Sequence, residues 1–327
     1  MLYSQSFLDS LEAELANILW RWNIQSDAEL KLLAISENAT YQVLQKTGKN
    51  IVLRVHRPAY HTYHEIISEL SWIDALHQSK IVKTPKIISQ IDGSLVATLS
   101  HQGQQRYVVA FEFIPGVSPD ENADLVPAFY TLGQITARLH QHSRQWTRPP
   151  GFCRKVWNFQ STLGSQPLWG DFRDALGLTP EGRKLLELTA LRLENLLTPW
   201  EKPDYFGLIH ADLRLANLLI DGEDLAVIDF DDCGISWYLY DFAAAVSFIE
   251  HQPYIPDLMD SWIRGYSSVA PLDQQEVTLL PVLVMLRRIL LTAWIASHAE
   301  TPTAQALGVG YTEGTLNLAE RFLSQYS

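Results

Sequence analysis

The sequence is short of cysteine and of positive charge, and each shortage excludes a class of protein. Cys153 and Cys233 are the only cysteines in 327 residues, so a small domain held together by disulfides is excluded. Lys and Arg together number 25 and Asp and Glu 37, which gives a net charge of −12. A nucleic-acid-binding face requires the opposite balance, so we expect no nucleic-acid partner.

The chain also lacks the uninterrupted apolar runs of exported and membrane proteins. Its first residues contain no basic segment followed by an apolar one, which predicts a cytoplasmic, reduced protein. The most apolar stretch, 279–296, contains Pro281, Arg287 and Arg288. Because arginine is costly inside a bilayer, this stretch predicts a buried helix and no membrane partner. We expect the two arginines either to pair with internal acids or to face an anionic substrate.

The apolar periodicity divides the chain into two parts. The length predicts two domains or two lobes, and the pattern is β-rich up to Pro115-Gly116 and helical beyond it. This order predicts an α+β chain, with an antiparallel sheet, a leading helix and one further helix in residues 1–115, and mostly helices in 116–327. The expected strands are 30–35, 40–45, 51–56, 82–91, 95–100 and 107–114, with a hairpin turn at Asp92-Gly93; the expected helices are one capped by Ser6 that ends near Trp22, 63–77, 123–142, 180–197 and several after Asp241, and a β-rich island covers 218–230.

Polar residues at fixed intervals in the second part indicate the chemistry. His210, Asp212 and Asn217 lie in one segment between apolar runs, and Asp229 follows Asn217 by twelve positions. Phosphoryl transfer needs a carboxylate beside the attacking hydroxyl and separate oxygen ligands for the Mg²⁺ that bridges the nucleotide phosphates. A loop followed by a hairpin would bring Asp229 back beside Asn217, and this arrangement matches a kinase catalytic site.

The segments 208–217, 228–231 and 240–243 resemble the aminoglycoside phosphotransferase and choline kinase family, the small-molecule relatives of protein kinases. This family includes type II homoserine kinases and a bacterial stress-response kinase. The resemblance covers most of the chain and implies a bilobal protein-kinase-like fold, ATP and Mg²⁺ as cofactors, and a small-molecule hydroxyl as acceptor. It implies that Asp212 is the catalytic base and that Asn217 and Asp229 are Mg²⁺ ligands.

The same resemblance makes residues 1–115 the nucleotide-binding lobe and 116–327 the lobe with the catalytic loop and acceptor site. Ser36 and Asn38 lie in the segment where the family covers the nucleotide phosphates, although this segment contains no glycine. The strand that contains Glu112 and Phe113 lies where the family binds the adenine ring through its backbone.

Arg54 departs from the family, which has a phosphate-binding lysine at this position. A guanidinium binds phosphate through a planar fork, whereas an ammonium is a compact point charge, so the change is chemically significant. The family pairs this residue with a helix glutamate. Glu69, which apolar residues follow, fits that role better than Glu65.

Four residues near the motif have supporting roles or open ones. His210 is expected to brace the catalytic loop through hydrogen bonds, and Asp241 to cap a helix and brace the same loop. Asp231 and Asp232 suit either a metal or substrate contact or a turn, and the sequence does not decide between them.

Aromatic and histidine residues elsewhere have both structural and functional interpretations. Trp157, Trp169 and Tyr240 are expected to pack in the core, with an acceptor pocket as the alternative. His140 and His142 end a helix without metal-binding spacing, which favours surface or capping roles.

The sequence therefore predicts an ATP- and Mg²⁺-dependent kinase of a small hydroxylated molecule such as an aminoglycoside, homoserine or a choline-like compound. A protein Ser/Thr acceptor, as in the stress-response branch, stays open. Arg54 and the glycine-free loop also fit a nucleotide-binding regulator with little transfer activity. A two-metal hydrolase built on His210, Asp212, Asp229 and Asp231 is a third interpretation. The sequence does not indicate an oligomeric state.

Overall fold

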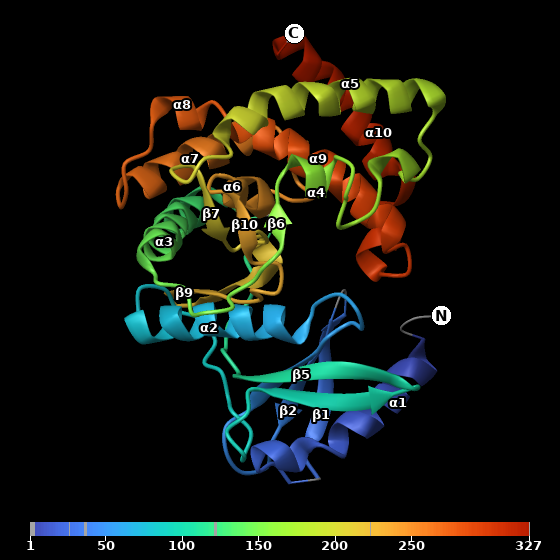
Figure 1. The fold of residues 1–327 in the computed structure, drawn as a ribbon, viewed down its shortest axis with the longest axis vertical. Coiled ribbons are helices and arrows are strands. Elements are labelled where there is room, and N and C mark those ends of the chain that lie inside the picture. Colours follow the sequence, from blue (N-terminus) through green and yellow to red (C-terminus); the bar gives the residue numbers. More distant parts are fainter. Residues whose placement is uncertain (1–3, 26, 36–37, 121–122, 223, 327) are drawn as a thin grey trace. The chain divides into compact units, whose positions relative to one another are not determined.

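The computed structural model describes residues 4–25, 27–35, 38–120, 123–222 and 224–326 (Figure 1). The chain divides into two compact units, one formed by the residues up to Gly116 together with Arg148–Arg154, and the other by Val117–Thr147 and the residues from Lys155 onward. The first unit contains α1 (Gln5–Ala16), η1 (Leu19–Trp22), β1 (Glu29–Ile35), β2 (Ala39–Leu44), β3 (Ile51–Val55), α2 (Tyr63–Ser79), β4 (Val96–His101) and β5 (Gln104–Glu112).

An antiparallel sheet in the order β1-β2-β3-β5-β4 forms the first unit. Helix α1 presents Phe7, Leu11 and Leu15 to one face of this sheet, where they share a buried cluster with Leu53 and Val55 of β3. Because side chains alternate along a strand, Arg54 between them lies on the opposite face. The alternation in β3 therefore separates an apolar face from a face that carries a charge.

Helix α2 lies along the face that Arg54 occupies. Thr62 caps α2, and Glu65 completes the capping box by accepting hydrogen bonds from the Thr62 backbone N–H (2.7 Å) and hydroxyl (2.9 Å). This role occupies Glu65 at the helix start. Glu69, one turn further on, is buried and is the partner of Arg54.

Three details of the expected first unit are wrong. Ser4, not Ser6, caps α1, by accepting a hydrogen bond from Phe7 N. The expected strand 82–91 is an irregular segment with one isolated bridge, Ile87 to Phe111. The hairpin turn lies instead between β4 and β5, at Gln102 and Gly103, which both have positive φ (50° and 76°). An apolar run alone did not distinguish an extended segment from a paired strand.

The second unit is mostly helical, with two small sheets. The order β6-β10-β7 forms one sheet and the hairpin β8-β9 the other. Its main elements are α3 (Val126–Gln145), β6 (Val156–Trp157), α4 (Phe159–Thr162), η2 (Phe172–Asp174), α5 (Pro180–Leu197), η3 (Thr198–Trp200), β7 (Phe206–Ile209), η4 (Leu215–Asn217), β8 (Leu218–Asp221), β9 (Asp224–Val227), β10 (Gly234–Trp237), α6 (Tyr240–Ala245), α7 (Ile255–Ser267), α8 (Gln274–Val277), α9 (Leu280–Ser297) and α10 (Pro302–Gln325).

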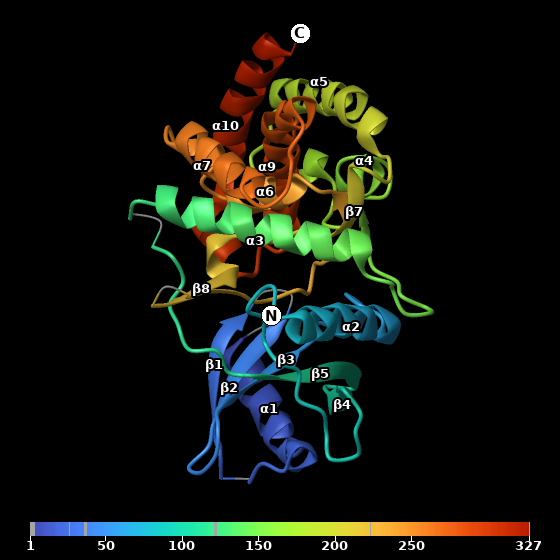
Figure 2. The ribbon, with the colours of Figure 1, turned by 90° about the vertical axis from the view of Figure 1, so that its left-hand side faces the viewer.

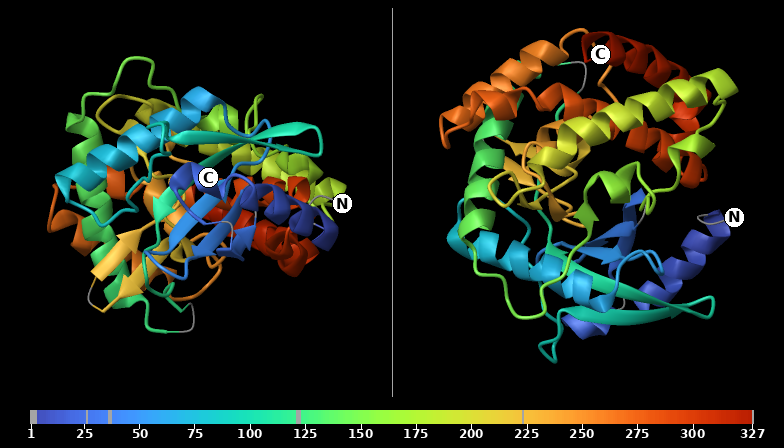
Figure 3. Two further views of the ribbon diagram at one scale, coloured as in Figure 1. Left: turned by 90° about the horizontal axis from the view of Figure 1, so that it is seen from below. Right: turned by 45° about the horizontal axis from the view of Figure 1, so that its top comes forward.

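Helix α9 is the central helix of this unit. Helices α5, α6 and α10 contact it, and α5 also contacts α10 (Figure 3, right). The helical stretch Gln274–Ser297 is the one candidate among the described residues that is long and apolar enough to cross a membrane, but 83% of its most apolar window is buried inside the protein. Both arginines in it are buried and ion-paired. These features are those of a core helix, as the sequence predicts.

Helices α3 and α7 lie side by side and approach closely at two glycines (Figure 2). A Cβ atom on Gly133 of α3 would lie 2.2 Å from the Trp262 carbonyl oxygen, and one on Gly265 of α7 would lie 2.0 Å from the Tyr130 carbonyl oxygen. Each clash is with backbone, which cannot move aside as a flexible side chain can. The absence of a side chain at these positions sets the distance between the two helices.

Gly133→Ala should therefore destabilise the protein. Alanine favours a helix by about 1 kcal/mol over glycine, but separating two packed helices costs more, so we expect a net loss of about 2 kcal/mol in the free energy of unfolding. Gly310→Ala is the matched control, because a Cβ there meets nothing within 4 Å. It should raise stability by up to about 1 kcal/mol. Chemical denaturation measures both, and equal effects would contradict the packing account.

Candidate active site

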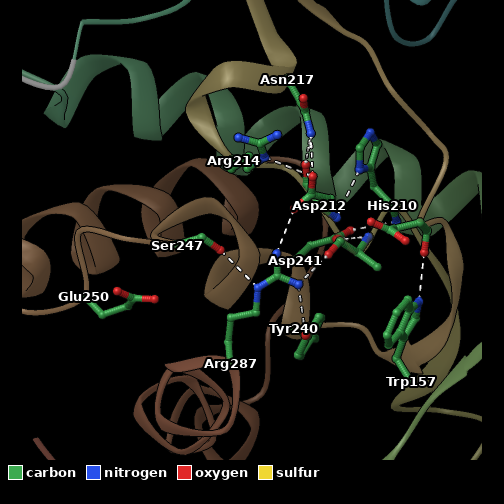
Figure 4. Close-up of polar contacts among 12 residues, drawn as sticks. Trp157, His210, Asp212, Arg214, Asn217, Tyr240, Asp241, Ser247, Glu250 and Arg287 are labelled. Carbon is green, nitrogen blue, oxygen red and sulfur yellow. Dashed lines mark hydrogen bonds and ion pairs between the residues drawn. The ribbon is translucent and has the colours of Figure 1, made fainter. Parts of the chain in front are cut away.

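The segment from His210 to Asn217 forms the loop between β7 and β8, and its start is strained (Figure 4). Ala211 has φ 65°, a left-handed conformation that costs about 1 kcal/mol or more for a residue with a side chain. Asp241 of α6 compensates, because its carboxylate accepts hydrogen bonds from the N–H of Ala211 (2.7 Å) and of His210 (3.3 Å). Asp241 thus braces the loop as expected, but it does not cap α6, where no side-chain cap is present.

Asp241 is itself positioned by His140 of α3. The imidazole Nε2 lies 3.0 Å from Asp241 Oδ2, and Nδ1 lies 3.1 Å from the Tyr266 hydroxyl. Because a carboxylate only accepts hydrogen bonds, Nε2 is the donor, and Nδ1 accepts from the hydroxyl. His140 and Asp241 are fully buried, so the expectation of a surface or capping role for His140 is wrong. Helix α3 reaches the catalytic loop through this chain of contacts.

His210 connects the loop to the segment that carries Asp229. The backbone N–H of Asp212 donates to His210 Nδ1 at 3.2 Å, so the protonated nitrogen of a neutral ring is Nε2. Nε2 lies 3.1 Å from the carbonyl oxygen of Ile228, the residue before Asp229. His210 therefore braces two parts of the motif.

The carboxylate of Asp212 has three side-chain partners. Oδ1 accepts from Nη2 of Arg287 at 2.7 Å, and Oδ2 accepts from Asn217 Nδ2 at 2.7 Å and from Arg214 Nε at 3.1 Å (Figure 4). Burial disfavours the charged form of Asp212, but Arg214, Arg287 and His210 outweigh this effect and keep the pKa of the carboxyl below its ordinary value. Asp212 is thus an ionised carboxylate with a fixed orientation at neutral pH.

Asn217 and Asp229 meet where the hairpin begins and ends. Leu218 of β8 pairs with Val227 of β9, and the Ile228 N–H donates to the Asn217 carbonyl oxygen at 2.9 Å, which brings the next residue, Asp229, beside Asn217. Asn217 Nδ2 donates to both the backbone and the side chain of Asp212. These two bonds orient the amide so that its oxygen is directed away from Asp212.

This donor set fits Mg²⁺. One amide oxygen and one carboxylate leave room for water and phosphate oxygens, which Mg²⁺ retains in nucleotide sites. Within the described residues no group of three or more His, Cys, Asp or Glu side chains is arranged to hold a metal ion.

Asp231 and Asp232 follow directly and are both nearly buried, at 4% and 9% exposure. Asp231 donates its N–H to Asp229 Oδ1 at 3.4 Å, a local turn contact. The Asp232 carbonyl oxygen accepts from Trp157 Nε1 at 2.8 Å, and its carboxylate acts electrostatically on Arg287 and Tyr240. Asp232 thus belongs to the surroundings of Asp212.

The first unit brings Arg54 and Glu69 together. Nη2 of Arg54 lies 2.7 Å from each carboxylate oxygen of Glu69, and both side chains are buried. The Arg54 guanidinium also lies over the Phe111 ring, 5.4 Å from its centroid. The pairing expected from the sequence is present, with arginine in place of lysine.

The other residues expected to bind nucleotide are placed as follows. Asn38 is buried, and its Oδ1 accepts from the Arg57 N–H at 3.3 Å. Ser36 lies outside the described residues. The N–H groups of Glu112 and Phe113 donate to Lys86 O (2.8 Å) and Asn50 O (3.3 Å), so these two N–H groups already have backbone acceptors.

Sequence reasoning did not place Arg214 or Arg287 in the site. A signal existed for Arg287, because an arginine in a strongly apolar helix needs an internal acid. The sequence could not show which acid, since Asp212 lies 75 positions away. Arg214, two positions after Asp212, gave no signal beyond its proximity.

Comparison with known proteins identifies the family of this chain. The model of the phosphotransferase enzyme family matches residues 29–272, which include the five-stranded sheet of the first unit and the segments 208–217, 228–231 and 240–243. The chain belongs to this family. It is therefore an enzyme, a kinase, and the family and enzyme class predicted from the sequence are confirmed.

Several individual kinases are similar to this chain over most of its length. A solved microcompartment-associated aminopropanol kinase is 43% identical, with a TM-score of 0.90 over 96% of this chain and 98% of that one. Amicoumacin kinase from Bacillus subtilis (strain 168) is 24% identical over 86% of this chain and 83% of its own length. Homoserine kinase from Agrobacterium fabrum is 24% identical over 85% and 82%. The chain is thus similar to several kinases that are named for different small molecules.

Solved structures also confirm the fold. An amicoumacin kinase in complex with AMP-PNP and Ca²⁺ has a TM-score of 0.76 over 96% of this chain and 94% of that one, at 20% identity. The predicted bilobal kinase-like α+β fold is confirmed. That amicoumacin kinase binds AMP-PNP, a nucleotide of the ATP type, together with a divalent metal ion.

The buried His140 predicts a pH dependence of stability. Burial lowers the pKa of His140 below its usual 6.5, against the opposing effect of Asp241. Below that value the unfolded chain takes up a proton that the folded protein does not, so the free energy of unfolding should fall as the pH drops below 6.5, by up to about 1.4 kcal/mol per pH unit from this group.

His140→Gln is the test, because glutamine retains an N–H donor for Asp241 but does not titrate. Denaturant unfolding between pH 5 and pH 7, values that bracket the usual histidine pKa of about 6.5, should give a smaller slope of stability against pH for the variant than for the wild type. If the variant and the wild type gave parallel curves of stability against pH, His140 would have to be protonated to the same extent in the folded and unfolded states.

Proposed function

We propose that this protein is an ATP- and Mg²⁺-dependent kinase that transfers the γ-phosphoryl group to the hydroxyl of a small amino alcohol. The arrangement of Asp212, Asn217 and Asp229 supports the phosphoryl transfer. The choice of acceptor is supported by the 43% identity, over nearly the whole chain, to an aminopropanol kinase. Homoserine, named in several weaker relatives, is also an amino alcohol but carries a carboxylate.

In this mechanism Asp212 orients the acceptor hydroxyl and accepts its proton. The hydroxyl oxygen forms a bond to the γ-phosphorus while the bond from that phosphorus to the β–γ bridging oxygen breaks, so the products are a phosphate monoester, ADP and a proton on Asp212. A low pKa makes Asp212 a weak base, which suits a loose transition state in which the proton moves late. The main contribution of Asp212 is therefore to hold the acceptor hydroxyl in position for attack on the γ-phosphorus.

Asn217 and Asp229 are the proposed Mg²⁺ ligands. When bound, the ion would neutralise phosphate charge and screen the nucleophile from it. Asp229 has φ 60°, a left-handed conformation that its neighbours must maintain, which is common for residues under functional constraint. In the first lobe, Arg54 is proposed to bind the phosphates and Glu69 to orient its guanidinium.

The surroundings of Asp212 suit an acceptor with a positive charge. Asp231 and Asp232 place two further carboxylates next to the catalytic motif. Carboxylates stabilise an ammonium group through charge-assisted hydrogen bonds. Trp169 and Tyr240 are buried beside the Arg287 guanidinium, at 4.9 Å and 5.7 Å, so these rings pack around this arginine.

The central test is ADP formation with MgATP and a panel of acceptors: 1-amino-2-propanol, ethanolamine, homoserine, choline, an aminoglycoside and a generic protein substrate. We expect turnover with the short amino alcohols. Asp212→Asn should lower kcat by about 10³-fold or more and leave MgATP binding, followed by calorimetry, close to that of the wild type. If Asp212→Asn kept near-normal turnover, the assigned role of Asp212 would be wrong.

A second test concerns Arg54. Arg54→Lys keeps the charge but loses the planar guanidinium, which can bind phosphate through further N–H groups while Nη2 contacts both Glu69 oxygens, so kcat/KM for MgATP should fall roughly tenfold, the equivalent of one charge-assisted hydrogen bond. Lys46→Met, which breaks the exposed Lys46–Asp27 pair in the same unit, is the control and should not change it. A large gain of activity in Arg54→Lys would instead indicate a degraded nucleotide site.

A further inference from the structure

Arg287 of α9 has more contacts with the catalytic loop than a structural ion pair requires. Its exposure is 2%. Nη2 donates to Asp212 Oδ1 at 2.7 Å, Nη1 donates to the Tyr240 hydroxyl (3.1 Å) and to the Ala211 carbonyl oxygen (3.4 Å), and Nε donates to Ser247 Oγ (3.0 Å) (Figure 4). All three guanidinium nitrogens are therefore used, and two of their acceptors belong to the catalytic loop.

The contact with Ala211 completes a clamp on the strained residue of the loop. Asp241 accepts the N–H of Ala211, and Arg287 donates to its carbonyl oxygen. The peptide groups on both sides of the left-handed residue are thus fixed by buried charges from α6 and α9. The direction of the next side chain, Asp212, follows from this conformation.

The charge of Arg287 has a separate consequence. Asp212 carries −1, and Arg287 and Arg214 carry +1 each within 2.7 Å and 3.1 Å of its oxygens, so the three side chains together have a net charge of +1. An amino alcohol has two ends that a carboxylate could bind, the ammonium and the hydroxyl. An uncompensated carboxylate would prefer the ammonium, because a charged hydrogen bond is about twice as strong as a neutral one. Bound that way, the substrate would present no hydroxyl to the phosphate.

We propose that Arg287 is a positioning and specificity residue: it fixes the orientation of Asp212, and together with Arg214 it makes the charge at Asp212 net positive, so that the hydroxyl end of an amino alcohol, not the ammonium end, docks there. This inference rests on the proposed function. The ammonium is left to the carboxylates that follow Asp229, Asp231 and Asp232. Orientation and charge compensation are separable, because lysine can supply the second but not the fork geometry of the first.

The chain offers a matched control in the next residue. Arg288 is equally buried, at 2% exposure, and lies on the same helix, but it pairs with Glu250 at 2.8 Å and bonds Thr315 and the Tyr311 carbonyl oxygen. These three partners all lie outside the catalytic loop. The double variant Arg288→Met, Glu250→Gln removes this buried pair without leaving an unpaired charge, and it reproduces the loss of a buried arginine from α9.

The experiment is steady-state kinetics of the full chain with MgATP and 1-amino-2-propanol, with propylamine as an inhibitor that has an ammonium but no hydroxyl. In Arg287→Met, kcat should fall about 10²-fold with KM for MgATP unchanged. The inhibition constant of propylamine should fall about tenfold, the effect of one added favourable charged contact. The double variant at 288 and 250 should show the wild-type inhibition constant and a kcat within a few-fold of the wild type.

Arg287→Lys separates the two roles and also serves if Arg287→Met does not fold. Arg287→Lys should have the same inhibition constant for propylamine as the wild type, because the charge is kept, but a lower kcat than the wild type, because the fork geometry is lost. The inference is overturned if Arg287→Lys has wild-type kcat, or if propylamine inhibits Arg287→Met no better than the double variant. If the wild type turns over no amino alcohol at all, the proposed function fails instead, which is a distinct result.

Discussion

The second unit depends on one buried carboxylate, Asp241, more than on any other side chain. It accepts hydrogen bonds from two successive backbone N–H groups of the catalytic loop and from His140 of α3. Without these bonds the longer contact of Arg287 with the Ala211 carbonyl oxygen (3.4 Å) would be left to hold the left-handed conformation at Ala211. Helices α3 and α6 are thus connected to the loop that orients Asp212. Buried residues of the core therefore help to position the site.

A second layer of contacts acts on Asp212 itself. Arg287, Arg214 and Asn217 each reach its carboxylate from a different direction. The carboxylate is ionised and restrained, and it is a weak base. This is the behaviour expected of a kinase catalytic aspartate, for which position contributes more than proton affinity. The same contacts place a helix far along the chain, α9, directly in the catalytic machinery.

The sequence was informative where chemistry requires a fixed local spacing. The loop and hairpin that join Asp212, Asn217 and Asp229 could be predicted because these residues are close in the chain and their roles demand oxygen ligands. The pairing of Arg54 with Glu69 could be predicted because the family resemblance implies a helix glutamate as the partner, and the apolar residues that follow Glu69 favour it over Glu65. The structural order of two units, one rich in strands and one in helices, followed from the apolar periodicity of the chain.

The remaining features depend on long-range packing, which local patterns do not contain. His140 looked like a surface histidine because its partners, Asp241 and Tyr266, lie more than one hundred positions away. The position of Arg287 in an apolar helix indicated a buried acidic partner, but the sequence did not show which acid it is. The segment 82–91 has strand-like composition, yet whether it pairs depends on neighbours that compete for the edge of the sheet. The sequence alone likewise did not indicate which small molecule is the acceptor, and the proposed acceptor class rests on the similarity to an aminopropanol kinase.

The most direct test of the account is the chemical identity of the product. After reaction of 1-amino-2-propanol with MgATP, ³¹P NMR should show ADP and one phosphate monoester on the hydroxyl oxygen in equal amounts. That result would show that the hydroxyl meets Asp212 and that the ammonium is directed elsewhere. A phosphoramidate on nitrogen, or inorganic phosphate in place of an ester, would contradict it.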